Sequence, residues 1–247
     1  MKTLPAACLA LVALASSARG DAAATPPRSR PLVVLDAGHG GSNGGAVGAV
    51  PGLLEKHLTL ALTLAVRDRL AAGGVDVLLT RDRDVTLTLR QRVALANKQA
   101  ADLFVSIHAN ASPERVQRGF ETFVLTAAGV DRDARALRSE TGTPRRGVDP
   151  TTALVLDDVE RGAAQWEAAD LAVAIQRELR ALRGGAGDRG VRQDAHHVLL
   201  GATMPAVLVE VGFIDHPIEG RELATPAVQA GLADALAKAI LAAVPAR

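Results

Sequence analysis

The stretch Leu32-Val-Val-Leu-Asp-Ala-Gly-His-Gly-Gly-Ser-Asn-Gly-Gly-Ala-Val-Gly48 joins an apolar run to a glycine-rich segment that carries one histidine. The run Leu32–Asp36 is continuous and ends at glycines, which is typical of a buried strand. Three interpretations of the segment around His39 follow from this pattern. It is a loop that holds a phosphate, a flexible turn that happens to contain histidine, or the first ligand of a metal site.

The phosphate interpretation fails on the residues themselves. A dinucleotide fingerprint needs G-x-G-x-x-G between strand and helix, and Asn43 stands where its last glycine belongs. A Walker loop ends in Gly-Lys-Ser or Gly-Lys-Thr, and this segment has no lysine. The glycines therefore do not form a nucleotide site.

Strand-like and helix-like patterns alternate outward from this stretch, without repeats or a second linker. Strands are expected at Leu32–Asp36, Val75–Thr80, Leu103–Ile107, Gly119–Leu125, Val198–Leu200 and Ala206–Val211. Helices are expected at Leu54–Leu70, Leu87–Ala100, Ala168–Leu182 and Thr225–Val244. Residues 126–165 are predicted to be an irregular insertion with one short helix near Leu154–Ala164. The alternation predicts a single α/β domain with a mainly parallel sheet.

Composition narrows the classes of function. The 247 residues are 48% hydrophobic, enough for a full globular core, and the formal net charge of +1 gives no reason to expect nucleic acid. The chain has four Phe, one Trp and no Tyr, so a stacking platform for bases or sugars is not expected.

The N-terminus has the pattern of an export signal. Lys2 precedes the apolar run Leu4–Ala15, and Ser16-Ser-Ala18 supplies the small residues that a signal peptidase reads. We expect a signal peptide at residues 1–20, a linker at 21–31 and one catalytic domain at 32–247. The run is shorter than the ~20 residues of a spanning helix, so no stable membrane anchor is expected. The only cysteine, Cys8, lies in the signal, and an exported protein without disulfides is predicted, in a periplasm or outside the cell.

Four side chains are placed where an α/β sheet gathers its ligands, at the carboxyl ends of strands. His39 follows the first strand, His108 ends the third, Glu210 ends a late strand, and Glu55 opens the helix after the glycines. Each has a plainer explanation, since a lone loop histidine is usually a satisfied polar residue and Glu55 suits a helix N-terminus. Glu210 is harder to explain away, because a carboxylate after four apolar residues needs a partner or a metal. Together they are typical of a mononuclear zinc hydrolase.

The chain also resembles a known family. Six blocks carry the resemblance, in order from about Leu32 to Val244: Asp36-Ala-Gly-His39-Gly-Gly, Gly52-Leu-Leu-Glu55-Lys, Thr80-Arg81-Asp, Ala101-Asp-Leu-Phe-Val-Ser-Ile-His108-Ala-Asn110, Gly119-Phe-Glu-Thr and Pro205-Ala-Val-Leu-Val-Glu210-Val-Gly-Phe. They resemble the zinc-dependent N-acetylmuramoyl-L-alanine amidases, which are bacterial cell-wall hydrolases. The resemblance implies a mixed α/β sheet of about six strands flanked by helices.

The resemblance also implies roles. It assigns one Zn²⁺ per chain to His39, Glu55 and His108, and the catalytic carboxylate to Glu210. Peptidoglycan becomes the expected substrate, cut between N-acetylmuramic acid and the first L-alanine of the stem peptide. Asn110 and Arg81 are candidates for contacts with the ligands or the substrate, or for a structural role. The remaining histidines are expected to be surface or structural residues, with His197 the foremost exception: His57, His196, His197 and His216.

One departure from the family concerns residues 126–165, which are longer than in its minimal members. Some longer relatives carry here a helix that covers the zinc until an activator protein binds. The acidic run Asp157-Asp158-Val-Glu160 suits that role, although a groove wall or a solvated loop is the simpler interpretation. Two rival functions stay open. One is a wall-binding protein without catalysis, and the other is a zinc hydrolase of another exported amide or peptide.

Overall fold

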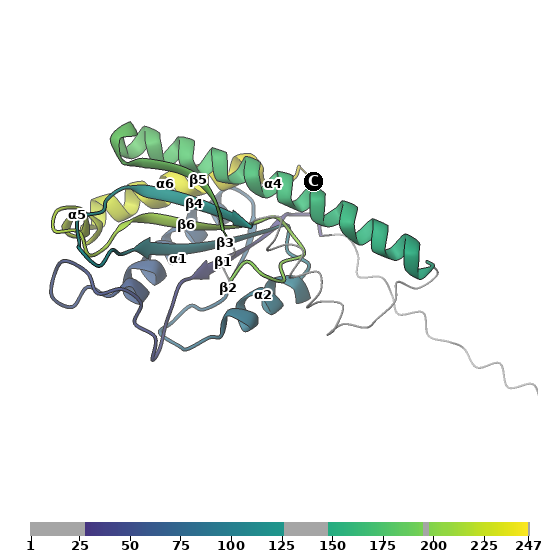
Figure 1. Cartoon of the computed structure of the whole chain (residues 1–247), viewed down its shortest axis with the longest axis horizontal. Helices are drawn as coiled ribbons and strands as arrows, with labels where there is room; N and C mark the ends of the chain where they lie inside the picture. Colours follow the sequence, from purple (N-terminus) through teal and green to yellow (C-terminus); the bar gives the residue numbers. More distant parts are fainter. Residues whose placement is uncertain (1–27, 126–147, 195–197, 247) are drawn as a thin grey trace, which may run out of the picture.

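The protein is described here from a computed structural model that covers residues 28–125, 148–194 and 198–246. Six strands form one sheet in the order β2-β1-β3-β6-β4-β5. Strands β2, β1, β3 and β6 run parallel, β4 is antiparallel to β6, and β5 is parallel to β4. The expected single α/β domain with a mixed, mainly parallel sheet of six strands is therefore confirmed (Figure 1). The expected signal peptide and most of the linker lie outside the described residues.

The elements follow the predicted alternation closely in the first half of the chain. The strands are β1 (Leu32–Ala37), β2 (Asp76–Leu79), β3 (Leu103–Asn110), β4 (Phe120–Leu125), β5 (Asp188–Asp194) and β6 (Ala206–Phe213). The helices are α1 (Glu55–Ala72), α2 (Leu89–Lys98), α4 (Pro150–Arg183), η1 (Gly185–Gly187), α5 (Glu219–Leu223) and α6 (Pro226–Ala243).

Helices cover the two faces of the sheet unequally. Alternate residues of a strand point to opposite faces, so Val33 and Leu35 enter a large apolar cluster with α1, α4 and α6. Leu32 and Val34 enter a smaller cluster on the other face, with α2 and residues 198–204. Asp36, the next residue of this second set, is fully buried. The smaller face thus receives the polar side chains of the strand ends.

The carboxyl ends of β1, β3 and β6 meet at one edge of the sheet, and β4 begins at the same edge because it is antiparallel to β6. This edge is hereafter called the ligand edge. Residue pairing across the strands aligns His108 with Glu210, and Glu210 with Glu121. Directly paired residues share a face, so these three side chains lie in one row.

Helix α4 differs from the sequence prediction. A single helix runs from Pro150 to Arg183, whereas an irregular stretch and a separate short helix were expected. Pro150 suits a first helical position, no further proline occurs before the helix ends at Arg183, and Gly162 alone does not stop the helix. A helix of 34 residues is about 51 Å long, and its first part extends past the sheet (Figure 1).

The direction of α4 also corrects the covering-helix hypothesis. Gln165 donates a hydrogen bond to the carbonyl of Leu125, at the end of β4 that lies away from the ligand edge. Arg183, at the other end of α4, reaches the carbonyl of Val211 near the ligand edge. Residues 154–166 therefore lie at the opposite end from His39, Glu55 and His108 and do not cover them in this structure. The side chains of Asp157, Asp158 and Glu160 lie outside the described residues.

Two further elements differ from expectation near the C-terminal third. Val198–Leu200 is a turn, and its residues are apolar because Val198 and Leu199 are buried in the smaller cluster. The edge strand is β5 instead, whose sequence Asp-Arg-Gly-Val-Arg-Gln-Asp lacks the apolar run used to find strands. Tertiary pairing with β4 decides its conformation.

Within the described residues, α6 is the one helix long and apolar enough to cross a membrane. Leu232, Leu236 and Ile240 on this helix are fully buried in the large cluster. Their packing identifies α6 as a core helix of the domain.

Candidate metal centre

His39 is held at the ligand edge by a constrained loop. Its backbone has φ 61°, a left-handed conformation that is uncommon for a residue with a side chain and that turns the chain sharply off β1. The Nδ1 atom lies 3.1 Å from Oδ1 of Asn43, which accepts its hydrogen, so Nε2 is the ring nitrogen that faces the cluster. Nε2 lies 2.9 Å from Oε2 of Glu55.

Glu55 is the first residue of α1, and its buried carboxylate is oriented by the backbone. The N–H of Ala46 donates to Oε2 at 2.9 Å, and the N–H of Ala109 donates to Oε1 at 3.1 Å. His108, near the end of β3, places Nδ1 2.9 Å from Oε1. Each carboxylate oxygen therefore faces one imidazole.

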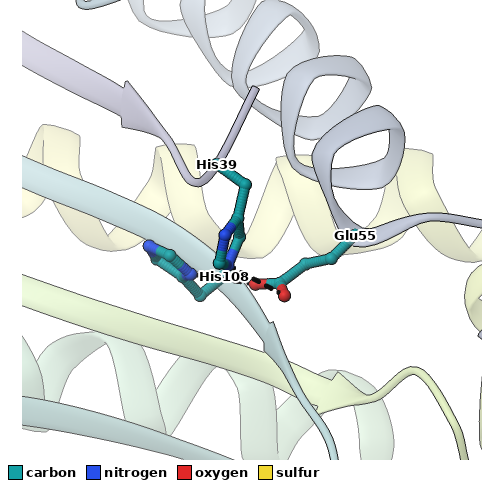
Figure 2. Close-up of side chains that lie close together, drawn as sticks. All are labelled: His39, Glu55 and His108. Carbon is teal, nitrogen blue, oxygen red and sulfur yellow. Dashed lines mark hydrogen bonds and ion pairs between the residues drawn. The ribbon is translucent and has the colours of Figure 1, made fainter. Parts of the chain in front are cut away.

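The three side chains converge on one point, as Figure 2 shows. One donor atom from each of His39, Glu55 and His108 lies within 4.8 Å of the others. Two glycines leave the space, because a Cβ on Gly38 would stand 2.4 Å from the His108 ring and a Cβ on Gly45 would stand 2.6 Å from Glu55 Oε2. Two imidazoles and one carboxylate form the N/O donor set of a catalytic zinc site, so the residues fit such an ion.

The charges of this cluster are strongly coupled. Burial raises the pKa of Glu55, but the hydrogen bonds from His108 and His39 outweigh it, and the pKa falls far below the usual range. The hydrogen bond to Glu55 in turn raises the pKa of His39. Glu55 is thus kept ionised, which is the form that binds a metal.

Glu210 stands beside the three ligands on the neighbouring strand. It pairs with His108 across β3 and β6, so the two side chains share a face, about 4.8 Å apart along the sheet. Its Oε2 is buried and has no hydrogen-bond partner among the described residues. Burial raises the pKa of Glu210 well above its usual value, and the charges of Glu55 and Glu121 add to the shift. A cation at the three ligands would favour its ionised form.

Comparisons with known proteins identify the family of the chain. The sequence profile of the N-acetylmuramoyl-L-alanine amidase family matches residues 33–242. The chain belongs to this family. It is 34% identical over 218 residues to N-acetylmuramoyl-L-alanine amidase AmiA of Escherichia coli. This match covers 85% of this chain and 75% of that protein.

Solved structures give the same result. The amidase AmiC2 of Nostoc punctiforme superposes with a TM-score of 0.65 at 29% identity and covers 86% of this chain and 96% of that one. The CwlD amidase of Clostridioides difficile, solved in complex with the GerS lipoprotein, has a TM-score of 0.63 at 26% identity and covers 87% of this chain and 98% of that one.

Two buried arginines support the loop around His39 in this amidase domain. Arg81 donates to the carbonyls of Ala37 and Gly38 at 2.9 and 2.8 Å. Because Arg81 is only 3% exposed, it holds the loop and offers no surface to a substrate. Arg92, which sequence reasoning missed, donates to the carbonyl of His39 at 2.6 Å.

Arg92 is itself fixed by Asp36, the buried acidic residue of β1. Its Nη1 lies 2.7 Å from Asp36 Oδ1, and the hydroxyls of Thr80 and Ser106 donate to the same carboxylate at 2.6 and 2.7 Å. The sequence did offer one signal for this contact: Asp36 is an acidic residue in an otherwise apolar, buried strand, and such a residue needs a charged or hydrogen-bonding partner.

Replacing Arg92 by methionine is expected to lower the free energy of unfolding by about 3–5 kcal/mol, because Asp36 then keeps a buried charge without its ionic partner. Urea denaturation of the metal-free protein measures the change. Arg90→Met on the same helix is the matched control, because Arg90 is exposed and its loss should change stability by about 0.5 kcal/mol or less. Equal stability of the two variants would contradict the role of Arg92.

Asn110 forms a hydrogen bond with Glu121 rather than with a candidate metal ligand, as far as the described residues show. Its Nδ2 donates to Oε1 of Glu121 at 2.8 Å, and Glu121 is a second buried carboxylate of the row, one strand beyond Glu210. Of the remaining histidines, His57 is exposed and His216 accepts hydrogen bonds from backbone N–H groups at the start of α5, as expected for surface and structural residues. His196 and His197 lie outside the described residues.

Proposed function

We propose that the protein hydrolyses the amide bond between N-acetylmuramic acid and the first L-alanine of the peptidoglycan stem. One Zn²⁺ per chain would be held by His39, Glu55 and His108, with Glu210 as the catalytic carboxylate. One observation carries the proposal, namely the convergence of three donor atoms beside Glu210, whose buried Oε2 has no hydrogen-bond partner among the described residues. Family membership supplies the substrate class.

The residues have separate tasks in this reaction. When bound, zinc supplies a Lewis acid for the amide carbonyl and lowers the pKa of water towards ~7. Glu210 accepts a proton from the attacking water while the oxygen of that water bonds to the carbonyl carbon. As the carbon–nitrogen bond breaks, Glu210 returns the proton to the departing nitrogen of L-alanine. Arg92 and Arg81 keep the His39 loop in place throughout.

Two rival functions are less well supported. A wall-binding protein without catalysis does not need three converging candidate metal donors beside a carboxylate with a buried, unpaired oxygen, and the described residues have both. A zinc hydrolase of another exported amide or peptide would use the same four residues, so chemistry alone does not separate it from an amidase.

Digestion of purified peptidoglycan, followed by mass spectrometry of the products, tests the proposal. We expect intact stem peptides with a free L-alanine amine, together with about one zinc per chain by metal analysis. Cleavage between residues of the stem would support the rival hydrolase. Absence of any cleavage by the zinc-loaded protein would support the wall-binding function.

Export to the periplasm or the outside of the cell is part of this proposal, because the substrate lies there and residues 1–20 read as a signal peptide. An activator protein acting on residues 126–165 also stays a prediction. Exposed apolar side chains on the extending part of α4 are typical of a surface that binds another protein, and they are Leu156, Val159 and Trp166. Deletion of Thr151–Ala164 should change the response to such a partner while the ligand edge stays intact.

A further inference from the structure

The row of polar side chains at the ligand edge continues beyond the proposed catalytic residues. Register places His108 on β3 beside Glu210 on β6, and Glu210 beside Glu121 on β4. The next strand is β5, at the edge of the sheet. There Arg189 and Arg192 both point their guanidinium groups at Glu121.

A bulge in β5 makes this pairing geometrically feasible. Residues three apart on a regular strand face opposite sides of a sheet. The register between β4 and β5 shifts at this point, and Gly190 has φ 80°, which only glycine adopts readily. The extra residue turns Arg189 and Arg192 to the same side, with Nε atoms 3.1 and 3.4 Å from Glu121 Oε2.

Among the described residues, these two guanidinium groups share the one carboxylate of Glu121. The Glu121 side chain is 7% exposed, whereas those of Arg189 and Arg192 are 30% and 51% exposed. Arg189 is further held by Gln117, whose Oε1 accepts at 3.0 Å, and by the Phe213 ring at 5.1 Å. Arg192 presents the more open guanidinium, a group whose planar donors suit a carboxylate.

The proposed reaction fixes which part of the substrate lies here, and the inference rests on that reaction. Glu210 gives its proton to the departing nitrogen, so the peptide stem must leave on the Glu210 side of His108, towards β4 and β5. The muramoyl part then lies on the other side of the ligands. A cavity of about 300 Å³ opens there and is lined by His39, Leu87, Leu89 and Val198, among others.

We propose that Arg189 and Arg192 form a subsite for a free carboxylate on the second residue of the peptide stem. Neighbouring strands are about 4.8 Å apart, so the guanidinium groups over β4 lie about one strand spacing beyond Glu210. An extended peptide spans about 3.3–3.6 Å per residue, which brings the second stem residue to this position. A glutamate linked through its γ-carboxyl carries its α-carboxylate there. Glu121 holds the two arginines together for that contact.

The subsite is tested with two synthetic muramoyl peptides that differ only in the second residue, which carries either a free α-carboxylate or a carboxamide. We expect the protein to favour the carboxylate about tenfold or more in kcat/KM, mainly through KM. Arg192→Gln should bring the ratio close to one. Arg177→Gln, an exposed arginine on α4 that lies outside the ligand edge, should keep the preference. Equal cleavage of both peptides by the unaltered protein would overturn the subsite and leave the amidase function intact.

A binding measurement separates this inference from the proposed function. Calorimetric titration with the free dipeptide L-alanyl-γ-D-glutamate and with its α-carboxamide needs no catalysis. Tighter binding of the carboxylate, lost in Arg192→Gln, would support the subsite even if neither muramoyl peptide were cleaved. Binding that does not distinguish the two dipeptides would count against it. Thermal unfolding of Arg192→Gln should match that of the unaltered protein, because this side chain is half-exposed on an edge strand.

Discussion

Glu210→Gln is expected to lower kcat for peptidoglycan hydrolysis about 10²–10⁴-fold while zinc stays bound at about one ion per chain. Glutamine has nearly the same shape but does not accept the proton of the attacking water. The three proposed metal ligands come from other elements and keep their contacts to one another. Turnover on labelled peptidoglycan and metal content of the same sample give the two readings. Glu167→Gln, exposed on α4, serves as control and should retain full activity. Unchanged turnover in Glu210→Gln would remove Glu210 from the mechanism.

Glu210→Gln should lower activity but raise the free energy of unfolding of the metal-free protein. The pKa of Glu210 in the folded, metal-free protein is raised by burial, so the unfolded chain loses this proton at a lower pH than the folded one. The free energy of unfolding therefore falls as pH rises from the ordinary glutamate range towards the raised pKa. Metal-free Glu210→Gln lacks this loss and should be more stable than the metal-free parent at neutral pH. Urea denaturation at two pH values measures the difference. Such a gain is expected where a catalytic group is held at a cost to stability.

Periodicity predicted the buried elements well and the exposed ones poorly. Strands β1, β3 and β6 have sequences that are apolar because both faces are covered, so each was found within a few residues. Strand β5 was missed, because an edge strand that carries arginines for a neighbouring carboxylate has no apolar run. Val198–Leu200 was misread for the converse reason, since burial alone made it apolar. Hydrophobic pattern reports burial first and secondary structure second.

The candidate site shows the same division. His39, Glu55, His108 and Glu210 could be proposed from the sequence because each is a polar residue at the end of a predicted element. Arg92 and Arg189 were missed, because their partners lie far away in sequence and are brought close only by the order of the strands. The cross-strand pairing of Glu121 with Glu210 depends on β4 being antiparallel, which no local pattern specifies.

Loss of the metal should have an effect at least as large as loss of Glu210. His108→Ala removes one of three donors and leaves Glu55 with a single imidazole partner. Removal of a residue that only orients a ligand typically lowers metal affinity about 10–100-fold. The zinc affinity of His108→Ala should fall by more than that. Asn43→Ala is that milder comparison, because Asn43 is not one of the three donors and touches His39 through its outer nitrogen, while it also accepts from the N–H of Gly45 at 3.1 Å. His108→Ala should have no hydrolytic activity. Asn43→Ala should lose activity at low zinc and regain it when zinc is added.

Thermal unfolding gives a reading of the metal site that does not depend on activity. Zinc at about 100 times its dissociation constant should stabilise the parent protein by about 2.7 kcal/mol, because the ion binds the folded chain only. His108→Ala should show no such shift at the same zinc concentration, and Asn43→Ala should show a smaller one. Chelation of the parent protein should abolish hydrolysis, and zinc should restore it. Full hydrolysis by the chelated protein would exclude a metal mechanism, and the three converging donors would then have to serve the fold alone.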